Sequence, residues 1–271
     1  MKFEQNFNKS FFFFLKKLKN KENFAFVRYS DGELDILQNY YVELSEKKVQ
    51  RGSEILSQAP YPQEDHKVFN PKLHQESRNK LLDSFLFRKE NYYKGMSCPC
   101  CVPSHRVIEM LKIHGPGDEQ HICWANQFVN SNFPHFVSHM IKEIKNRDDI
   151  VLIGNEAINP DECEINVKKF FSVGYNCFVN DLNLIEDIKK YIEEEKIKNH
   201  LFLFSAASLS EILIYELYKD YPDNTYLDIG TTMHKQLGLN LARDYLRAFY
   251  DKKPHPDIYK KCTHPTAVNK K

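Results

Sequence analysis

The sequence predicts an α/β fold: a single Rossmann-like domain whose mostly parallel sheet is flanked by helices. In the second half of the chain, apolar segments of strand length alternate with segments that have helix-like periodicity. The expected strands span residues 149–155, 175–181, 200–206 and 224–230. The expected helices between them span residues 163–171, 184–196 and 209–219. Repeated alternation of this kind favours right-handed crossovers and parallel pairing of the strands.

The first half of the chain predicts the same architecture with a less regular pattern. A Phe-rich helix over about 5–20 precedes a buried strand at 23–29, which leads directly into a helix at 32–40. Residues 43–75 contain prolines, mixed charges and weak periodicity, so we expect loops and short helices there. A helix at 78–87, a strand and turn at 91–99 and a helix at 104–114 follow.

The domain organisation is expected to be simple. The chain shows no internal repeat or long linker, and 271 residues are enough to bury a substantial core without disulfides. We expect one domain over residues 1–250 and a basic, Pro-containing tail without a core pattern over residues 251–271.

Composition limits the classes of function. With 38 Lys and Arg against 37 Asp and Glu, the chain lacks the basic excess that nucleic-acid binding requires, so no nucleic-acid partner is expected. The odd number of cysteines, seven, fits a reducing compartment, and we expect a cytoplasmic protein. The apolar segment "SFFFFLKKL" is too short to span a bilayer. Its mixture of Phe and Lys would suit contact with an anionic membrane surface, but we expect its Phe face to pack on the domain.

The segment "FVRYSDGELDIL", residues 26–37, carries the first candidate site. It places Asp31 and Glu33 at a turn from a strand into a helix, where open α/β sheets bind ligands. Carboxylate oxygens suit a hard divalent ion such as Mn²⁺ or Mg²⁺. A structural role is the alternative, because Ser30 and Glu33 match the capping box of a helix N-terminus.

The turn "SAAS" carries a second candidate site, after the strand expected at 200–206. Its small side chains leave room for a diphosphate at the N-terminus of the next helix, with Ser205 and Ser208 as contacts. Tight packing of that helix on the sheet is the alternative.

Further carboxylates end the neighbouring strands. Asp228 could bind a ribose, orient a metal-bound water or act as a base, and capping of its loop is the alternative. Asp181 and Glu156 follow other expected strands at the same edge of the sheet, and they are further candidates for the base.

A mixture of aromatic and amide side chains follows residue 121 in "HICWANQFVNSNFPHF". Trp124 offers an aromatic face, and Asn126 and Asn130, four apart, would share one face of a helix, which suits a sugar ring and its hydroxyl groups. Trp124 in the core is the alternative.

The Cys-rich segment "SCPCCVPSH" supplies Cys98, Cys100, Cys101 and His105, which suggests zinc. No second Cys/His pair lies at the usual spacing, so we expect reduced thiols at a strand end and turn.

Taken together, these motifs resemble those of the GT-D-type glycosyltransferases. "VRYSDGE" resembles the Arg-(Phe/Tyr)-Gly-Asp-Gly-Glu signature near the start of that family. "FLFSAASLSEILIYELY" followed by "YLDIGTTMH" is similar to the family's Gly-Pro-Thr-Ala turn, helix and Asp-Ile-Gly-His strand end. Order and spacing agree from about residue 24 to 235. The sequence departs from the pattern at Ser30, at "SAAS" and in the residues that separate Gly230 from His234.

The resemblance implies a GT-D-like hexosyltransferase. Such an enzyme would move a sugar from a nucleotide-sugar donor, with a UDP-sugar as the expected donor, to a hydroxyl group of a glycan or glycoconjugate. Asp31 and Glu33 match the residues that would hold Mn²⁺ or Mg²⁺, and Arg28 matches the signature's arginine. The expected catalytic residues are Asp31, Glu33 and Asp228, the expected donor contacts are Arg28, Ser205, Ser208 and Asp181, and the expected acceptor contacts are Trp124, Asn126 and Asn130. A nucleotide-using phosphohydrolase and a nucleotide-sugar-binding protein without turnover are the alternatives.

Overall fold

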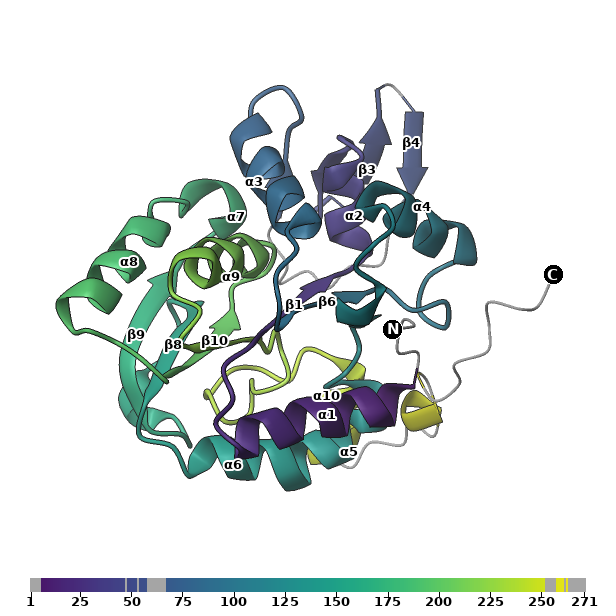
Figure 1. Ribbon diagram of the computed structural model, residues 1–271. Coiled ribbons are helices and arrows are strands. Elements are labelled where there is room, and N and C mark those ends of the chain that lie inside the picture. Colours follow the sequence, from purple (N-terminus) through teal and green to yellow (C-terminus); the bar gives the residue numbers. More distant parts are fainter. Residues whose placement is uncertain are drawn as a thin grey trace.

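A seven-stranded parallel sheet forms the centre of the protein (Figure 1). The computed structural model describes residues 6–46, 48–52, 54–57, 67–251, 257–260 and 262. The strand order is β7-β6-β1-β11-β10-β8-β9, and each neighbouring pair is parallel. The strands are β1 (Ala25–Tyr29), β6 (Tyr92–Met96), β7 (Ile122–Trp124), β8 (Ile150–Asn155), β9 (Val167–Val173), β10 (Leu201–Ser205) and β11 (Thr225–Asp228). The predicted α/β class is confirmed.

Helices cover both faces of this sheet (Figure 1), and each face has its own apolar core. Alternate residues of a strand point to opposite faces, so Val27 and Tyr29 of β1 lie in one core and Phe26 in the other. The first face carries α2 (Asp31–Leu37), α3 (Gln75–Leu86), α4 (Ser104–His114), α7 (Cys177–Asn180), α8 (Leu184–Glu194) and α9 (Leu209–Asp220). The second carries α1 (Phe7–Lys19), α5 (Phe133–His135), η3 (Phe136–Met140), α6 (Ile141–Lys145), α10 (Asp244–Tyr250) and η5 (Ile258–Lys260). Three short 3-10 turns complete the fold: η1 (Glu119–His121), η2 (Asn130–Asn132) and η4 (Pro160–Glu162).

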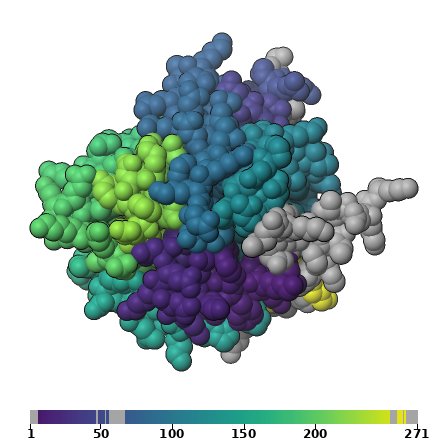
Figure 2. Space-filling view, in the orientation of Figure 1, coloured from purple at the N-terminus to yellow at the C-terminus, as the bar shows by residue number. Residues whose placement is uncertain are grey.

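The N-terminal helix α1 packs on the sheet with one face, as expected. Asn6 caps it by accepting a hydrogen bond from the Lys9 N–H, and Phe11 and Phe14 are buried. The side chain of Phe12 is exposed, and Figure 2 shows α1 in purple along the surface. Among the described residues, we find no helix with the length and apolar character that a bilayer span requires.

The described residues between 41 and 69 include an antiparallel sheet, where the composition of residues 43–75 predicted loops and short helices. Its order is β4-β3-β2-β5. The strands are β2 (Tyr41–Glu43), β3 (Lys48–Arg51), β4 (Glu54–Ser57) and β5 (Val68–Phe69). These strands have two to four residues, too few for a periodic pattern, so pairing with neighbours determines them and local sequence does not. Residues 47, 53 and 58–66 lie outside the described part of the chain.

For two elements after β8, the type of secondary structure is the opposite of the predicted one. The expected helix at 163–171 contains most of strand β9, and the expected strand at 175–181 contains the short helix α7. Short apolar runs do not distinguish the two types. Strand β9 lies at the edge of the sheet, where Lys168 and Lys169 are exposed, and lysine is common on edge strands.

The C-terminal segment contributes to the core, although its sequence shows no core pattern. Ile258 is 6% exposed and Cys262 is 1% exposed. The Cys262 carbonyl accepts a hydrogen bond of 3.0 Å from Ser131 Oγ. Ile258 and Cys262 therefore pack on the domain.

Candidate functional site

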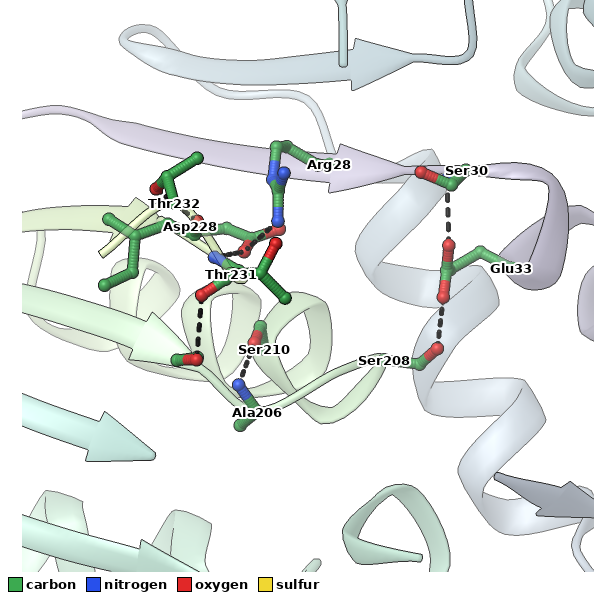
Figure 3. A network of polar contacts seen from close by, with 12 residues as sticks. Arg28, Ser30, Glu33, Ala206, Ser208, Ser210, Asp228, Thr231 and Thr232 are labelled. Atoms are coloured by element: carbon green, nitrogen blue, oxygen red, sulfur yellow. Dashed lines mark hydrogen bonds and ion pairs between the residues drawn. The ribbon is translucent and has the colours of Figure 1, made fainter. Parts of the chain in front are cut away.

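The candidate site lies where three adjacent strands end. β1, β11 and β10 are neighbours in the sheet, so their parallel carboxyl ends meet at one edge. Arg28 comes from the end of β1, Asp228 from the end of β11, and Ser208 from the turn after β10 (Figure 3). Glu33 reaches the same place from the first turn of α2 (Figure 3). The fold thus brings together both candidate regions that the sequence predicted.

A two-point ion pair joins Arg28 to Asp228. Arg28 Nε donates to Asp228 Oδ2 at 3.0 Å, and Nη2 donates to Oδ1 at 2.9 Å. Burial alone would lower the pKa of Arg28, but the Asp228 carboxylate outweighs burial and raises it. For Asp228, burial raises the pKa despite the guanidinium beside it. Since both Asp228 oxygens are occupied, Asp228 is arranged to hold Arg28 in position.

Gly230 allows the close approach of Arg28. Its φ is 46°, a left-handed conformation that favours glycine, and its N–H donates to Asp228 Oδ1 at 3.0 Å. A Cβ at this position would overlap Arg28 Nη2. The Gly230 carbonyl also accepts a hydrogen bond of 2.8 Å from Ser205 Oγ. Ser205 therefore supports the loop that orients the ion pair.

The Glu33 carboxylate is a second centre of charge. Its Oε1 pairs with Lys67 Nζ at 2.8 Å and accepts a hydrogen bond from Ser208 Oγ, and Lys67 Nζ also contacts Ser208 Oγ. Its Oε2 accepts a hydrogen bond of 2.8 Å from the Ser30 N–H, which is the reciprocal bond of the capping box. Burial would raise the pKa of Glu33, but Lys67, Ser208 and Ser30 together lower it to about 2. Glu33 thus serves as a helix cap and as the partner of a buried ammonium group.

Glu211 of α9 is a buried carboxyl group that the sequence analysis missed. It is 3% exposed, and its Oε2 has no hydrogen-bond partner among the described residues. Burial, followed by the charges of Glu33 and Asp228, raises its pKa well above the usual range. Glu211 is thus a third carboxyl group in this site, beside Glu33 and Asp228, which pair with Lys67 and Arg28.

The local sequence explains why two of these residues were missed. Glu211 stands three residues after Ser208, which matches a capping box and suggests only a structural role. Lys67 follows an irregular, Pro-containing segment and belongs to no motif. Only the fold shows that both side chains lie beside Glu33.

The surroundings of Asp31 and Glu33 bear on how a divalent ion could fit there. Carboxylate oxygens are suitable ligands for Mn²⁺ or Mg²⁺. However, both Glu33 oxygens are engaged, and the Lys67 ammonium supplies positive charge where an ion bound to Glu33 would lie. Asp31 begins α2 and is half-buried, and its carbonyl accepts a hydrogen bond from Arg106 at 2.9 Å. The residues as arranged fit a cationic side chain and not a divalent ion at Glu33.

Asp181, a predicted donor contact, and Glu156, a candidate base, lie on other parts of the fold. Asp181 follows α7, and its Oδ2 accepts a hydrogen bond of 2.9 Å from the Gly174 N–H, so it caps the loop after β9. Glu156 is exposed after β8, where its N–H donates to the Val173 carbonyl. Among the described residues, no hydrogen bond or ion pair joins either side chain to Arg28, Asp228 or Glu33.

The predicted acceptor residues lie beside the cysteine-rich turn. Trp124 is 2% exposed and stacks on Phe7, with 6.3 Å between ring centroids. Residues after β7 form a turn leading to η2, so Asn126 and Asn130 do not share a helix as expected. Their amide groups instead donate to cysteine sulfurs. These three side chains therefore contact protein groups in this structure.

Comparisons with known proteins find solved structures with a distantly similar fold. The site and sheet together define a parallel α/β protein with a charged cluster at the carboxyl edge of its strands. Two solved structures of domain of unknown function 1792 are similar to it, and one is described as having a distinct glycosyltransferase fold. Each shares 14% identity over 83% of this chain and 79% of that chain, with a TM-score of 0.48. No family model matches the chain, and no curated protein matches it significantly.

Proposed function

We propose that this protein is a glycosyltransferase that binds a nucleotide-sugar donor at the carboxyl edge of β1, β11 and β10. The supporting observation is the convergence of Arg28, Glu33, Ser208 and Asp228 in one polar site, although they span 200 residues of sequence. These are the positions that match the GT-D-type signature, turn and strand end. The expected products are a nucleoside diphosphate and a glycan or glycoconjugate carrying the transferred hexosyl group.

The two cationic side chains suit a departing diphosphate. The side chain of Arg28 is 18% exposed and that of Lys67 is 10% exposed, so both are partly desolvated yet open at the edge of the site. Preorganised cations are most effective in such an environment, where they stabilise charge that develops on the leaving group. Asp228 orients Arg28 and Glu33 orients Lys67, so neither cation needs to be repositioned during transfer.

The turn at Ser208 suits the donor phosphates. It leads into α9, a helix of 12 residues whose N-terminus favours negative charge. Ala207 in this turn is exposed, with φ of 45°. A diphosphate bound here would lie beside Lys67, which contacts Ser208. We therefore place the phosphates between this turn and Arg28 and do not assign the acceptor to Trp124, whose ring is buried.

A screen of nucleotide sugars by thermal shift tests this proposal. A ligand that binds only the folded state raises the melting temperature. We expect at least one UDP-, GDP- or ADP-sugar to stabilise the protein, and release of the nucleoside diphosphate to increase when a glycan acceptor is added. Donor hydrolysis that no acceptor stimulates would indicate a phosphohydrolase. Stabilisation without turnover across the acceptor panel would indicate a binding protein, and absence of stabilisation by every donor would contradict the proposal.

A further inference from the structure

Four cysteines from two distant segments meet beside the carboxyl ends of β6 and β7. Cys98, Cys100 and Cys101 lie in the turn after β6, and Cys262 follows η5, 164 residues beyond Cys98. The four Sγ atoms lie within 4.8 Å of one another, and none of the four cysteines is in a disulfide. The exposed His105, which the sequence offered as a fourth zinc ligand, is not in this group. Cys262 completes the set instead.

The spacing of the sulfurs suits one central ion. Zinc–sulfur bonds are about 2.3 Å long, so two sulfurs of a tetrahedral site lie about 3.8 Å apart. The Sγ atoms of Cys98 and Cys262 are 3.8 Å apart, and those of Cys101 and Cys262 are 3.6 Å apart. The Cys98–Cys100 distance is shorter, at 2.9 Å. A disulfide would engage only two of the four sulfurs and would not account for the gathering of all four.

The sequence and backbone of the turn are also suited to metal binding. Cys98 and Cys101 have the C-x₂-C spacing that is common in zinc sites. The N–H groups of Cys101 and Val102 both donate to the Cys98 carbonyl, at 3.0 and 3.1 Å. These bonds close the turn and direct both cysteines toward the same point.

Amide donors surround the sulfurs. Asn126 Nδ2 lies 3.1 Å from Cys101 Sγ, 3.3 Å from Cys262 Sγ and 3.4 Å from Cys98 Sγ. Asn130 Nδ2 lies 3.3 Å from Cys262 Sγ. Hydrogen-bond donors around metal ligands fix their orientation and tune the site. They also offset the negative charge that four thiolates would bring. This independent feature distinguishes the cluster from a chance grouping of thiols.

We propose that Cys98, Cys100, Cys101 and Cys262 bind one zinc ion in a closed, structural site. Four protein ligands leave no position for substrate, which is typical of structural zinc. Cys98 and Cys262 also pack in an apolar cluster with Phe7 and Trp124. The ion therefore fastens the C-terminal segment to the turn after β6, beside the start of α1. This inference does not depend on the proposed glycosyltransferase activity.

Metal analysis of the purified full-length chain is the first test. We expect about one zinc per chain in the parent and a large loss of zinc in Cys262→Ser. Cys163→Ser is the matched control, because Cys163 lies outside the cluster and contacts the Asn159 carbonyl; it should retain zinc as the parent does. A parent without zinc after growth in zinc-supplemented medium, iron in its place, or full retention of zinc by Cys262→Ser would overturn the proposal.

Trp124 provides a second measurement within the intact protein. It is the single tryptophan of the chain and packs in the same apolar cluster as Cys98 and Cys262. We expect a zinc chelator to shift the Trp124 emission to longer wavelength and to lower the melting temperature of the parent, and added zinc to reverse both changes. Cys163→Ser should respond in the same way. If the emission and melting temperature of the parent are insensitive to the chelator although zinc is removed, the ion does not fasten this segment, and the structural role is wrong. If Cys262→Ser fails to fold, the reversal by zinc in the parent still tests the proposal.

Discussion

The Glu33→Gln variant distinguishes two structural roles of Glu33, as a helix cap and as the partner of Lys67 in a buried ion pair. Glutamine can retain the capping-box bond to the Ser30 N–H, so a cap alone predicts a melting temperature close to that of the parent. The structure predicts a clear loss of stability, because the neutral amide would leave the Lys67 ammonium without the carboxylate that it contacts at 2.8 Å. Removing one partner of a buried ion pair is strongly destabilising, since the other charge remains desolvated.

The pKa of Glu33 gives the magnitude of the stability loss expected in Glu33→Gln. The fold lowers it from the usual 4.5 to about 2, and one pKa unit corresponds to about 1.4 kcal/mol. The charged carboxylate therefore contributes about 3 kcal/mol to the free energy of unfolding at neutral pH. For a domain of this size that corresponds to a melting temperature lower by roughly 6–12 °C.

The sign of the pH dependence follows from the lowered pKa. The contribution is fully present above the unfolded-state value of 4.5 and is lost as the pH falls toward about 2. The stability difference between the parent and Glu33→Gln should therefore narrow over that interval. Glu46→Gln, at an exposed position, should have the same melting temperature as the parent across this pH interval.

A double-mutant cycle with Lys67→Met completes this test. Thermal melts of the parent, both single variants and the double variant at pH 7 should show that the double variant loses less stability than the two single variants together. Additive losses, or a Glu33→Gln protein that melts with the parent, would refute the ion pair and leave the cap as the only structural role of Glu33.

Three further predictions concern the donor site. Gly230→Ala should lower donor affinity and cost about 1–3 kcal/mol of stability, because its Cβ would strike Arg28; equal donor affinity in a folded variant would contradict this account. Ser208→Leu should weaken donor binding at temperatures where the variant is folded, measured by calorimetry, whereas unchanged affinity would remove the turn from the site. Donor affinity should be similar with and without added Mn²⁺ in buffer passed over a chelating resin, because Arg28 and Lys67 supply the charge; strict dependence on Mn²⁺ would show that a divalent ion takes part in donor binding, as the family resemblance implies.

The central sheet could be predicted from sequence where strands are buried on both sides. β8 and β10 begin with continuous apolar runs, and all four residues of β11 are buried, because helices cover both of their faces. The edge strand β9 carries exposed lysines, so its sequence has the mixed polar and apolar pattern that predicts a helix. The short strands β2 to β5 are determined by pairing with each other, which local patterns do not encode.

The candidate site could be predicted only where its residues belong to motifs. Arg28 lies near the end of β1, Asp228 ends β11, and Glu33 lies in the first turn of the helix after β1, so their shared edge follows from parallel pairing. Lys67 and Cys262 come from segments without periodicity, and only the folded chain brings them to their partners. These contacts could not be predicted because the partners lie far apart in the sequence, although the residue types themselves suit the contacts.

The affinity of a nucleotide sugar for Arg28→Lys tests the central claim most directly. Lysine keeps the charge but cannot reproduce the two-point contact with Asp228 or a forked contact with phosphate. Arg51→Lys, at an exposed position of β3, is the matched control. With the donor found by the thermal-shift screen, we expect Arg28→Lys to bind at least about tenfold more weakly than the parent, a loss of about 1.4 kcal/mol, and Arg51→Lys to bind as the parent does. Equal affinity of a folded Arg28→Lys protein would show that the donor does not bind at the edge of β1, β11 and β10.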